Sequence, residues 1–279
     1  MTIARNVINH LILLAGTAFL ILPVAAIFLS STHPTATLAS EGLQLSWGGY
    51  LLENYRAVIL LDAGFSDRVT PLAMLGNSLV VGAGVASLTT LFSLLTAYAI
   101  VFFKFRRAGF VFWLVLVTLL FPLESRFIST FKVTADLGLI NTRLGIVLPV
   151  IAAALGTFFY RQYFKSLPGE LIEAATLDGA GPIRFLIDIV IPLSWPATGG
   201  IFAIAFMIGW NQYLWPIMIS TDDSLYTLVR GIQLVGPISG PGMALAVISI
   251  APPLVLLLAV QRWFFTALKL PVDRNSSSM

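Results

Sequence analysis

Residues 166–196 read SLPGELIEAATLDGAGPIRFLIDIVIPLSWP, a polar-punctuated segment between strongly apolar runs. The segment is too short to be a soluble domain of its own. Ser166 is suited to cap a helix that begins with a proline and a glutamate in its first turn. Gly179 permits the backbone angles that end such a helix, and Pro182 can open a second helix. The sequence therefore predicts a helix–turn–helix elbow.

The composition of the whole chain is that of a membrane protein. Hydrophobic residues make up 58% of the 279 residues, charged residues only 10%, and the mean hydropathy is +0.92. We therefore expect an all-α integral membrane protein. The net charge of +3 comes from scattered basic residues, which argues against a nucleic-acid partner and leaves membrane lipid as the surroundings.

Six apolar runs are long enough to cross a bilayer. We expect one transmembrane domain over residues 1–279, with spans at about 11–29, 72–103, 109–128, 143–164, 197–219 and 243–265 and the elbow at 166–196. The first run could instead be a signal peptide. Its 19 apolar residues and the five runs that follow favour a retained signal-anchor helix.

The sequence contains none of the common signatures of cofactor or metal chemistry. It has no cysteine, and its two histidines, His10 and His33, stand in no metal-binding spacing. No GxxxxGK[ST] phosphate-binding loop occurs, so any work driven by ATP needs a partner subunit. We expect no catalytic, cofactor-binding or metal-ligating residues in this chain.

The elbow carries a specific family pattern. It resembles the EAA loop of ABC-importer permeases, which is matched here by Glu173, Ala174, Ala175, Asp178, Gly179 and Ala180, followed by Phe185, Ile189, Pro192 and Pro196. Nearly the whole chain is similar to the MalG-like carbohydrate permeases. That resemblance implies a type I ABC importer permease fold with six transmembrane helices, whose cytoplasmic coupling helix sits in a cleft of an ATPase subunit.

The same resemblance implies partners and a location. A permease of this family forms a heterodimer with a second permease subunit, binds two ATPase subunits that hold ATP and Mg, and receives substrate from an extracytoplasmic binding protein. It lies in the bacterial inner membrane as a multi-pass protein. The six residues of the EAA pattern are then the ATPase-coupling residues.

Three stretches narrow the resemblance to the permeases of sn-glycerol-3-phosphate importers. They are residues 121–126, 159–164 and 209–216, although the last has near relatives throughout the sugar permeases. The implied substrate is glycerol 3-phosphate or a glycerophosphodiester. A di- or oligosaccharide is the alternative.

Polar residues near span ends are candidates for the substrate path. They are Glu124, Arg126, Asn211 and Gln212. Arg126 is suited to bind a phosphate because its planar guanidinium can hold two oxygens. For an arginine at a membrane interface, however, extension to the lipid headgroups or pairing with Glu124 or Asp136 is favoured over contact with a ligand.

Basic residues also predict the orientation. Ten lysines and arginines fall on the side of the termini and the elbow, against six on the other side, which places both termini and the elbow in the cytoplasm. Ser78, Gly82 and Ala86 form a small-residue seam suited to close helix packing. We expect it to serve the heterodimer, with packing within this subunit as the alternative.

Two other classes of function remain possible on the sequence. A secondary transporter would need ionisable residues at mid-membrane, and the spans are nearly bare of them. A membrane-embedded enzyme would need a nucleophile, metal ligands or an acid–base pair, and no such set is visible.

Overall fold

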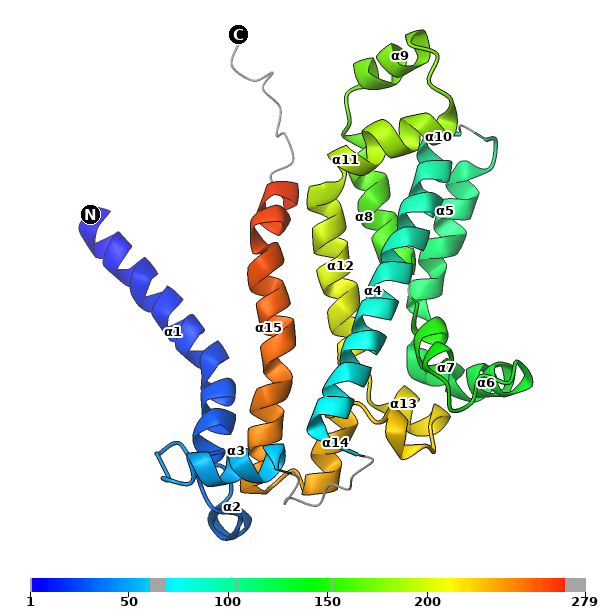
Figure 1. Cartoon of the computed structure of the whole chain (residues 1–279). Coiled ribbons are helices and arrows are strands. Elements are labelled where there is room, and N and C mark those ends of the chain that lie inside the picture. The colour runs from blue at the N-terminus through cyan, green and yellow to red at the C-terminus, as the bar shows by residue number, and fades with distance from the viewer. Residues whose placement is uncertain (1, 61–68, 104, 152, 269–279) are drawn as a thin grey trace. The chain divides into compact units, whose positions relative to one another are not determined.

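The computed structural model describes residues 2–60, 69–103, 105–151 and 153–268, and the part of the chain that it describes is helical apart from turns and loops. Figure 1 shows the helices of the chain. By their contacts, the residues divide into two compact units. Unit 1 comprises residues 1–77 and 222–251, and unit 2 comprises residues 78–221 and 252–279. The long helices α4 (Pro71–Phe102) and α15 (Gly240–Leu268) contribute to both.

Unit 1 combines long apolar helices with short polar ones. Its further elements are α1 (Thr2–Ser30), α2 (Thr35–Glu41), α3 (Leu51–Ile59), η4 (Asp223–Leu225) and α14 (Leu228–Val235). The buried side-chain amide of Asn54 donates to the carbonyls of Ser31 and His33, both at 2.8 Å. Gly240 packs against the same amide so closely that a Cβ there would lie 2.5 Å from it. Asn54 therefore joins α3 to the end of α1 and the start of α15.

Two helices of unit 1 differ from the sequence prediction. Residues 30–70 were expected to form a loop with one short helix near 50–60, and residues 221–240 a loop. The structure adds α2 in the first and α14 in the second. Both are at most eight residues long, and such short helices are stabilised by packing rather than by a pattern visible in the sequence.

Unit 2 contains the elbow and the helices around it. Besides most of α4, its elements are α5 (Ala108–Val117), η1 (Thr118–Leu120), α6 (Leu123–Asp136), α7 (Arg143–Val147), η2 (Leu148–Val150), α8 (Ala153–Lys165), α9 (Gly169–Leu177), α10 (Pro182–Phe185), the π-helical turn η3 (Leu186–Val190), α11 (Ile191–Leu193), α12 (Trp195–Trp210) and α13 (Leu214–Ile219).

Six crossings of a membrane are possible within the described residues. Three helices are long and apolar enough on their own: residues 5–30, 71–102 and 240–261. Three further candidates are pairs of helices bent at a short break, by 106° after Leu120, by 50° after Val150 and by 76° after Leu193. The predicted runs at 109–128 and 143–164 are thus broken helices rather than continuous ones.

The sharpest of these bends has a local cause at Pro122. Phe121, which precedes the proline, is extended with φ −88° and ψ 112°, as the proline ring requires of its neighbour. Helix α6 then starts afresh at Leu123 and continues to Asp136. Residues 131–136 are therefore helical, where the sequence had predicted a loop.

The fifth predicted span, 197–219, also breaks. Helix α12 ends at Trp210, and α13 starts only at Leu214. Pro216 lacks an amide hydrogen and its ring clashes with the carbonyl four residues earlier, which here belongs to Gln212. The break at residues 211–213 follows from this clash.

The small-residue seam of α4 is occupied within unit 2. Ser78, Gly82 and Ala86 are all buried, and a Cβ built on Gly82 would lie 2.9 Å from the Phe206 ring of α12. A Cβ built on Gly209 of α12 would in turn lie 3.2 Å from the Cα of Gly82. Gly82 therefore packs α4 against α12 in the same chain, which is the alternative role of the seam, and its part in the heterodimer stays a prediction.

Candidate functional site

The elbow is closed by a glycine turn at the end of α9. Gly179 has a φ of +69°, and the amide of Ala180 donates to the carbonyl of Ala175 at 2.9 Å. This bond spans five residues across a left-handed glycine, which is the Schellman arrangement for ending a helix. Ser166 does not cap α9 as predicted, because its hydroxyl donates backwards to the carbonyl of Tyr163 at 2.7 Å.

An aromatic platform holds the elbow against the helix ends. The hydroxyl of Tyr98 on α4 donates to the carbonyl of Pro182 at 2.6 Å, which ties the second elbow helix to α4. The ring of Phe102 lies 5.2 Å from that of Phe185 and 5.6 Å from that of Phe164. Buried Ala175 belongs to the same cluster. One face of the elbow is thus fixed to α4 and α8.

Sequence reasoning had missed the platform. Its signal was present in the four-residue spacing of Tyr98 with Phe102 and of Tyr160 with Phe164, at the ends of two apolar runs. This spacing places both rings of each pair on one helix face. It resembles any aromatic belt at a membrane interface, so nothing in the sequence linked it to the elbow.

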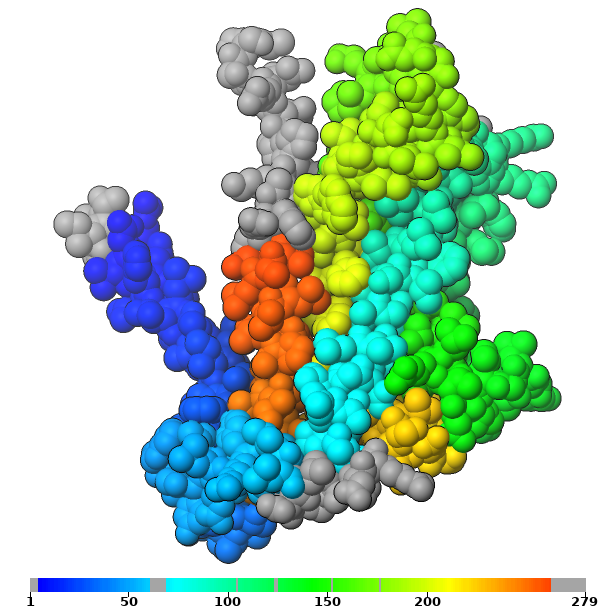
Figure 2. Space-filling model, in the orientation of Figure 1, coloured from blue at the N-terminus to red at the C-terminus, as the bar shows by residue number. Residues whose placement is uncertain are grey.

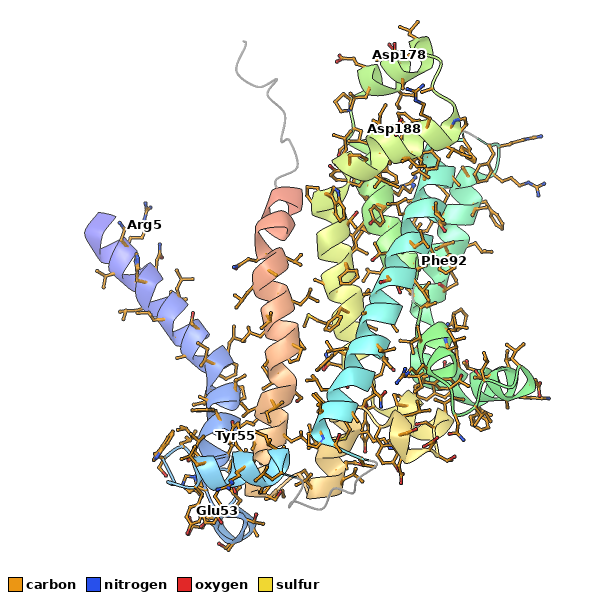
Figure 3. The ribbon with its side chains drawn as sticks, viewed as in Figure 1. Arg5, Glu53, Tyr55, Phe92, Asp178 and Asp188 are labelled. Carbon is orange, nitrogen blue, oxygen red and sulfur yellow. The ribbon has the colours of Figure 1, made fainter. Side chains whose placement is uncertain are left out.

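The opposite face of the elbow is exposed and mixes acidic with apolar side chains. Of the predicted coupling residues, Glu173, Ala174, Asp178 and Gly179 are exposed, Ala180 is half-buried and Ala175 is buried. Apolar Leu177 is 88% exposed. Figure 3 labels Asp178 on this elbow, and Figure 2 shows the yellow-green surface that the elbow presents. An exposed apolar side chain next to exposed carboxylates is typical of a surface that binds another protein.

The elbow does not pack continuously onto its platform. A pocket of about 340 Å³ lies between them, lined mainly by apolar side chains. Ile172 and Leu167 border it from the elbow, Phe103 and Val101 from α4, and Lys165 adds a charge. The elbow is therefore held around this pocket by separate contacts, which include buried Ala175, the ring of Phe185 and the Tyr98 hydrogen bond.

A second feature brings together two of the four substrate-path candidates. Arg126 of α6 and Gln212 of the α12–α13 break both line a pocket of about 50 Å³. Thr130 and Trp215 complete its polar and aromatic walls. The arginine is exposed, and Gln212 is half-buried, with its amide donating to the carbonyl of Ile208 at 3.1 Å.

Trp215 explains how this pocket is formed. Its side chain is 1% exposed, and its indole N–H donates to the carbonyl of Gly145 at 3.0 Å. Its ring lies 5.9 Å from that of Phe127, which follows Arg126 on α6. The sequence had suggested Trp215 as an interfacial residue. In the structure it is the buried anchor that joins α6, α7 and α13.

The other two candidates do not contribute to this pocket in the same way. Asn211 is exposed at the end of α12 and does not line it. The side chain of Glu124 lies outside the described part of the structure. Among the side chains that are described, Arg126 and Asp136 form no ion pair, so that suggested pairing is wrong.

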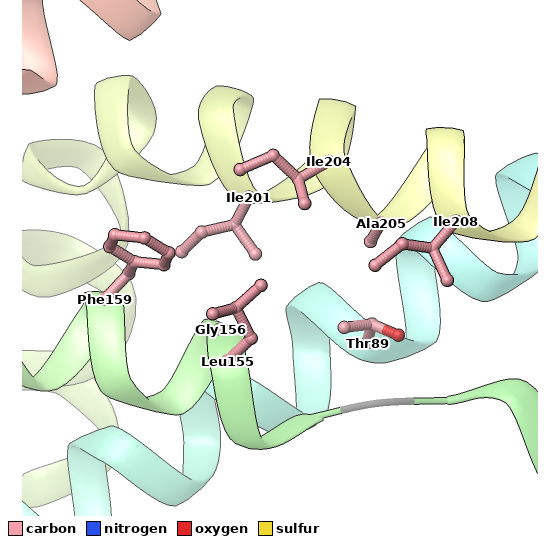
Figure 4. A pocket seen from close by; sticks show the side chains of 8 residues that line it. All are labelled: Thr89, Leu155, Gly156, Phe159, Ile201, Ile204, Ala205 and Ile208. Atoms are coloured by element: carbon pink, nitrogen blue, oxygen red, sulfur yellow. The ribbon is translucent and has the colours of Figure 1, made fainter. Parts of the chain in front are cut away.

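A third pocket, between α4, α8 and α12, is too small for a substrate. It measures about 10 Å³ and is lined almost entirely by aliphatic and aromatic side chains (Figure 4). Thr89 supplies the polar atom, a buried hydroxyl without a hydrogen-bond partner among the described residues. A space of this size holds about one water molecule at most.

Comparison with known proteins agrees with this architecture. In the sn-glycerol-3-phosphate transport system permease protein UgpE of Brucella melitensis, 38% of 272 aligned residues are identical, covering 94% of this chain and 95% of that protein. UgpE of Agrobacterium fabrum is 38% identical over 276 residues, covering 95% and 96%. The fold matches a chain of a bacterial ABC transporter involved in the import of the acidic polysaccharide alginate, with a TM-score of 0.77, 21% identity and coverage of 94% and 96%.

The elbow, its platform and most of the helices lie within the region that matches a family. Residues 78–269 match the family described as the binding-protein-dependent transport system inner membrane component. The chain belongs to this family and is an inner-membrane permease subunit of an ABC importer.

Proposed function

We propose that this permease imports glycerol 3-phosphate or glycerophosphodiesters. Support comes from the similarity to the UgpE proteins, which extends over nearly the full length of both chains. The resemblance at residues 121–126 includes Arg126, which lines the pocket of about 50 Å³ in unit 2. The chain carries out no chemistry of its own in this proposal. A partner ATPase binds ATP and Mg and supplies the energy.

The proposed assembly has the elbow on the cytoplasmic side. The excess of basic residues around the elbow and the termini supports this orientation. A second permease completes the translocation path, two ATPase subunits bind from the cytoplasm, and an extracytoplasmic binding protein delivers the substrate. The coupling residues are Glu173, Ala174, Ala175, Asp178, Gly179 and Ala180.

The two faces of α9 carry the coupling part of the proposal. Glu173 and Asp178 lie on the exposed face, where they can meet cations of the ATPase, while Ala175 is buried against the platform. A push on the exposed face therefore reaches α4 and α8 through packed side chains and the Tyr98 hydrogen bond. Movement of the ATPase would in this way shift the helices of the path.

Arg126 and Gln212 are the proposed substrate contacts. A guanidinium and an amide in one pocket can together bind a phosphate group by charge-assisted and neutral hydrogen bonds. Placement at lipid headgroups remains the alternative role of Arg126. Glu124 and Asn211 stay candidates for other positions along the path.

Uptake by cells that lack their own glycerol 3-phosphate transport tests the proposal. The whole importer is expressed with this permease, and accumulation of labelled glycerol 3-phosphate is measured with excess unlabelled glycerophosphodiester or disaccharide. The proposal expects competition by the diester and none by the disaccharide. Competition by the disaccharide alone would assign the permease to a sugar importer instead.

A further inference from the structure

Arg161 is a charged residue in the contact between α8 and α5. It lies on α8, one turn before Lys165 at the helix end. Its guanidinium carbon is 3.9 Å from the centroid of the Phe112 ring on α5, and that ring is only 5% exposed. The ring of Phe158 on α8 stacks on the ring of Phe112, with 6.4 Å between the two centroids. The cation therefore sits against the aromatic seam between α5 and α8.

No carboxylate in the described part of the chain forms an ion pair with Arg161. Helices α5, η1 and α12 contact α8, and α4 reaches it through the hydroxyl of Ser93, which donates to the carbonyl of Ala153. None of these four elements contains an aspartate or glutamate. The Nε atom of Arg161 is buried and has no hydrogen-bond partner among the described residues.

The guanidinium of arginine carries a positive charge and only hydrogen-bond donors. A ring face compensates only part of the cost of removing a cation from water. A buried guanidinium edge without a partner is costly. The arrangement is therefore incomplete and calls for an anion with hydrogen-bond acceptors.

The surroundings identify the kind of anion. On α5, the side chains of Phe110 and Trp113 are each 66% exposed and that of Leu114 is 56% exposed, as expected of a surface that faces lipid. The exposed Arg106 and Arg107 directly precede α5, and the exposed Lys165 is the last residue of α8. An anion at this depth, next to exposed aromatic side chains and under basic residues, has the position of a lipid headgroup.

We propose that Arg161 and the seam between α5 and α8 bind the phosphate of an anionic phospholipid from the leaflet on the elbow side. The guanidinium donates to the phosphate oxygens, its face rests on Phe112, and the acyl chains lie along the exposed apolar side chains of α5. Because α8 leads directly into the elbow, this lipid holds the helix end from which coupling movement enters the membrane. The proposal is independent of the transported substrate.

Native mass spectrometry of the assembled importer tests this site. The complex is purified and titrated with phosphatidylglycerol or phosphatidylcholine, and the number of bound lipids is followed against concentration. We expect one phosphatidylglycerol to bind more tightly than the rest. In Arg161→Gln this molecule should bind at least tenfold more weakly, and the preference over phosphatidylcholine should disappear. Arg161→Lys should keep the preference for the anionic lipid with reduced affinity.

Arg107→Gln is the matched control, because it removes an exposed charge at the same end of the membrane without touching the seam. It should leave the tight lipid in place. Phe112→Leu keeps the charge of Arg161 and an apolar side chain in the seam and should weaken the lipid less than Arg161→Gln does. Equal losses in Arg107→Gln and Arg161→Gln would overturn the proposal in favour of diffuse attraction. A second outcome would also overturn the proposal: Arg161→Gln leaves lipid binding unchanged, and the second permease no longer co-purifies. The counter-ion of Arg161 would then be a carboxylate of the second permease.

Discussion

The amide of Ala180 donates to the carbonyl of Ala175 at 2.9 Å across the left-handed Gly179, so the turn that ends α9 is fixed by one backbone bond and one glycine. Both alanines border the pocket beneath the elbow. The turn therefore sets how α9 presents its acidic face and also how the elbow rests on α4 and α8. We expect this turn to be the part of the elbow most sensitive to substitution.

Gly179→Val should uncouple transport from ATP hydrolysis. Space is not the reason, since a Cβ at this position would meet nothing within 4 Å. The left-handed conformation costs an L-residue about 1 to 2 kcal/mol, and a β-branched residue more. Uptake and ATPase activity of the purified complex measure the effect. Gly169→Ala, in the first turn of α9 with equally open surroundings and no positive φ, is the control and should transport normally.

Glu173→Ala should weaken binding of the ATPase. Glu173 is exposed on α9, and loss of a charge-assisted contact costs about 1.5 to 3 kcal/mol, or roughly 10- to 150-fold in affinity. The fraction of ATPase that co-purifies with the permease measures this loss. Glu53→Ala removes an exposed carboxylate from α3 in unit 1 and should have no effect. Wild-type recovery of the ATPase with Glu173→Ala would remove this residue from the coupling surface.

Gly82→Leu should destabilise the permease itself. The new side chain must displace the Phe206 ring, which lies 2.9 Å from the position of the Cβ, and such overpacking costs about 1 to 3 kcal/mol. Thermal unfolding of the complex should shift to lower temperature, and Phe206→Ala in the same chain should restore part of the loss. Gly76→Ala, on the same helix with nothing within 4 Å, should be neutral. An unchanged transition in Gly82→Leu would contradict the packing of α4 against α12.

Arg126 substitutions separate substrate binding from membrane anchoring. A phosphate contact needs the planar fork of arginine, so Arg126→Lys should raise the half-saturating concentration of glycerol 3-phosphate, and Arg126→Ala should raise it further. A residue that only reaches the headgroups would be replaced by lysine without loss. Gln212→Leu should also raise half-saturation if the shared pocket binds phosphate. Lys132→Ala, on the same helix but absent from the pocket, serves as the control.

The sequence predicted the class of the molecule and the identity of its elbow, because both depend on local patterns. Long apolar runs specify membrane helices, and the glycine at residue 179 specifies the turn. The breaks at Pro122 and Pro216 were harder to predict, since a proline inside an apolar run can kink a helix, end it or start a new one. Which of these occurs depends on packing, such as that of Trp215 against Phe127.

The pocket lined by Arg126 and Gln212 could not be predicted from the sequence for the same reason. Arg126 and Gln212 were both named from their positions near span ends, but their meeting in one pocket depends on the bends that bring α6 and the α12–α13 break together. The aromatic platform under the elbow likewise joins residues of α4, α8 and α10 that are far apart in sequence. Such contacts are tertiary and leave no periodic signal.

Reconstitution of the complete importer in proteoliposomes tests most directly whether this permease couples ATP hydrolysis to the uptake of glycerol 3-phosphate. The binding protein and labelled glycerol 3-phosphate are placed on one side and ATP with Mg on the side of the ATPase, and accumulation is followed for wild type and Glu173→Ala. We expect the accumulation of glycerol 3-phosphate to require ATP, the ATPase and the binding protein, and to be lower in Glu173→Ala than in wild type. Accumulation that persists without the ATPase, or that occurs for a disaccharide and not for glycerol 3-phosphate, would contradict it.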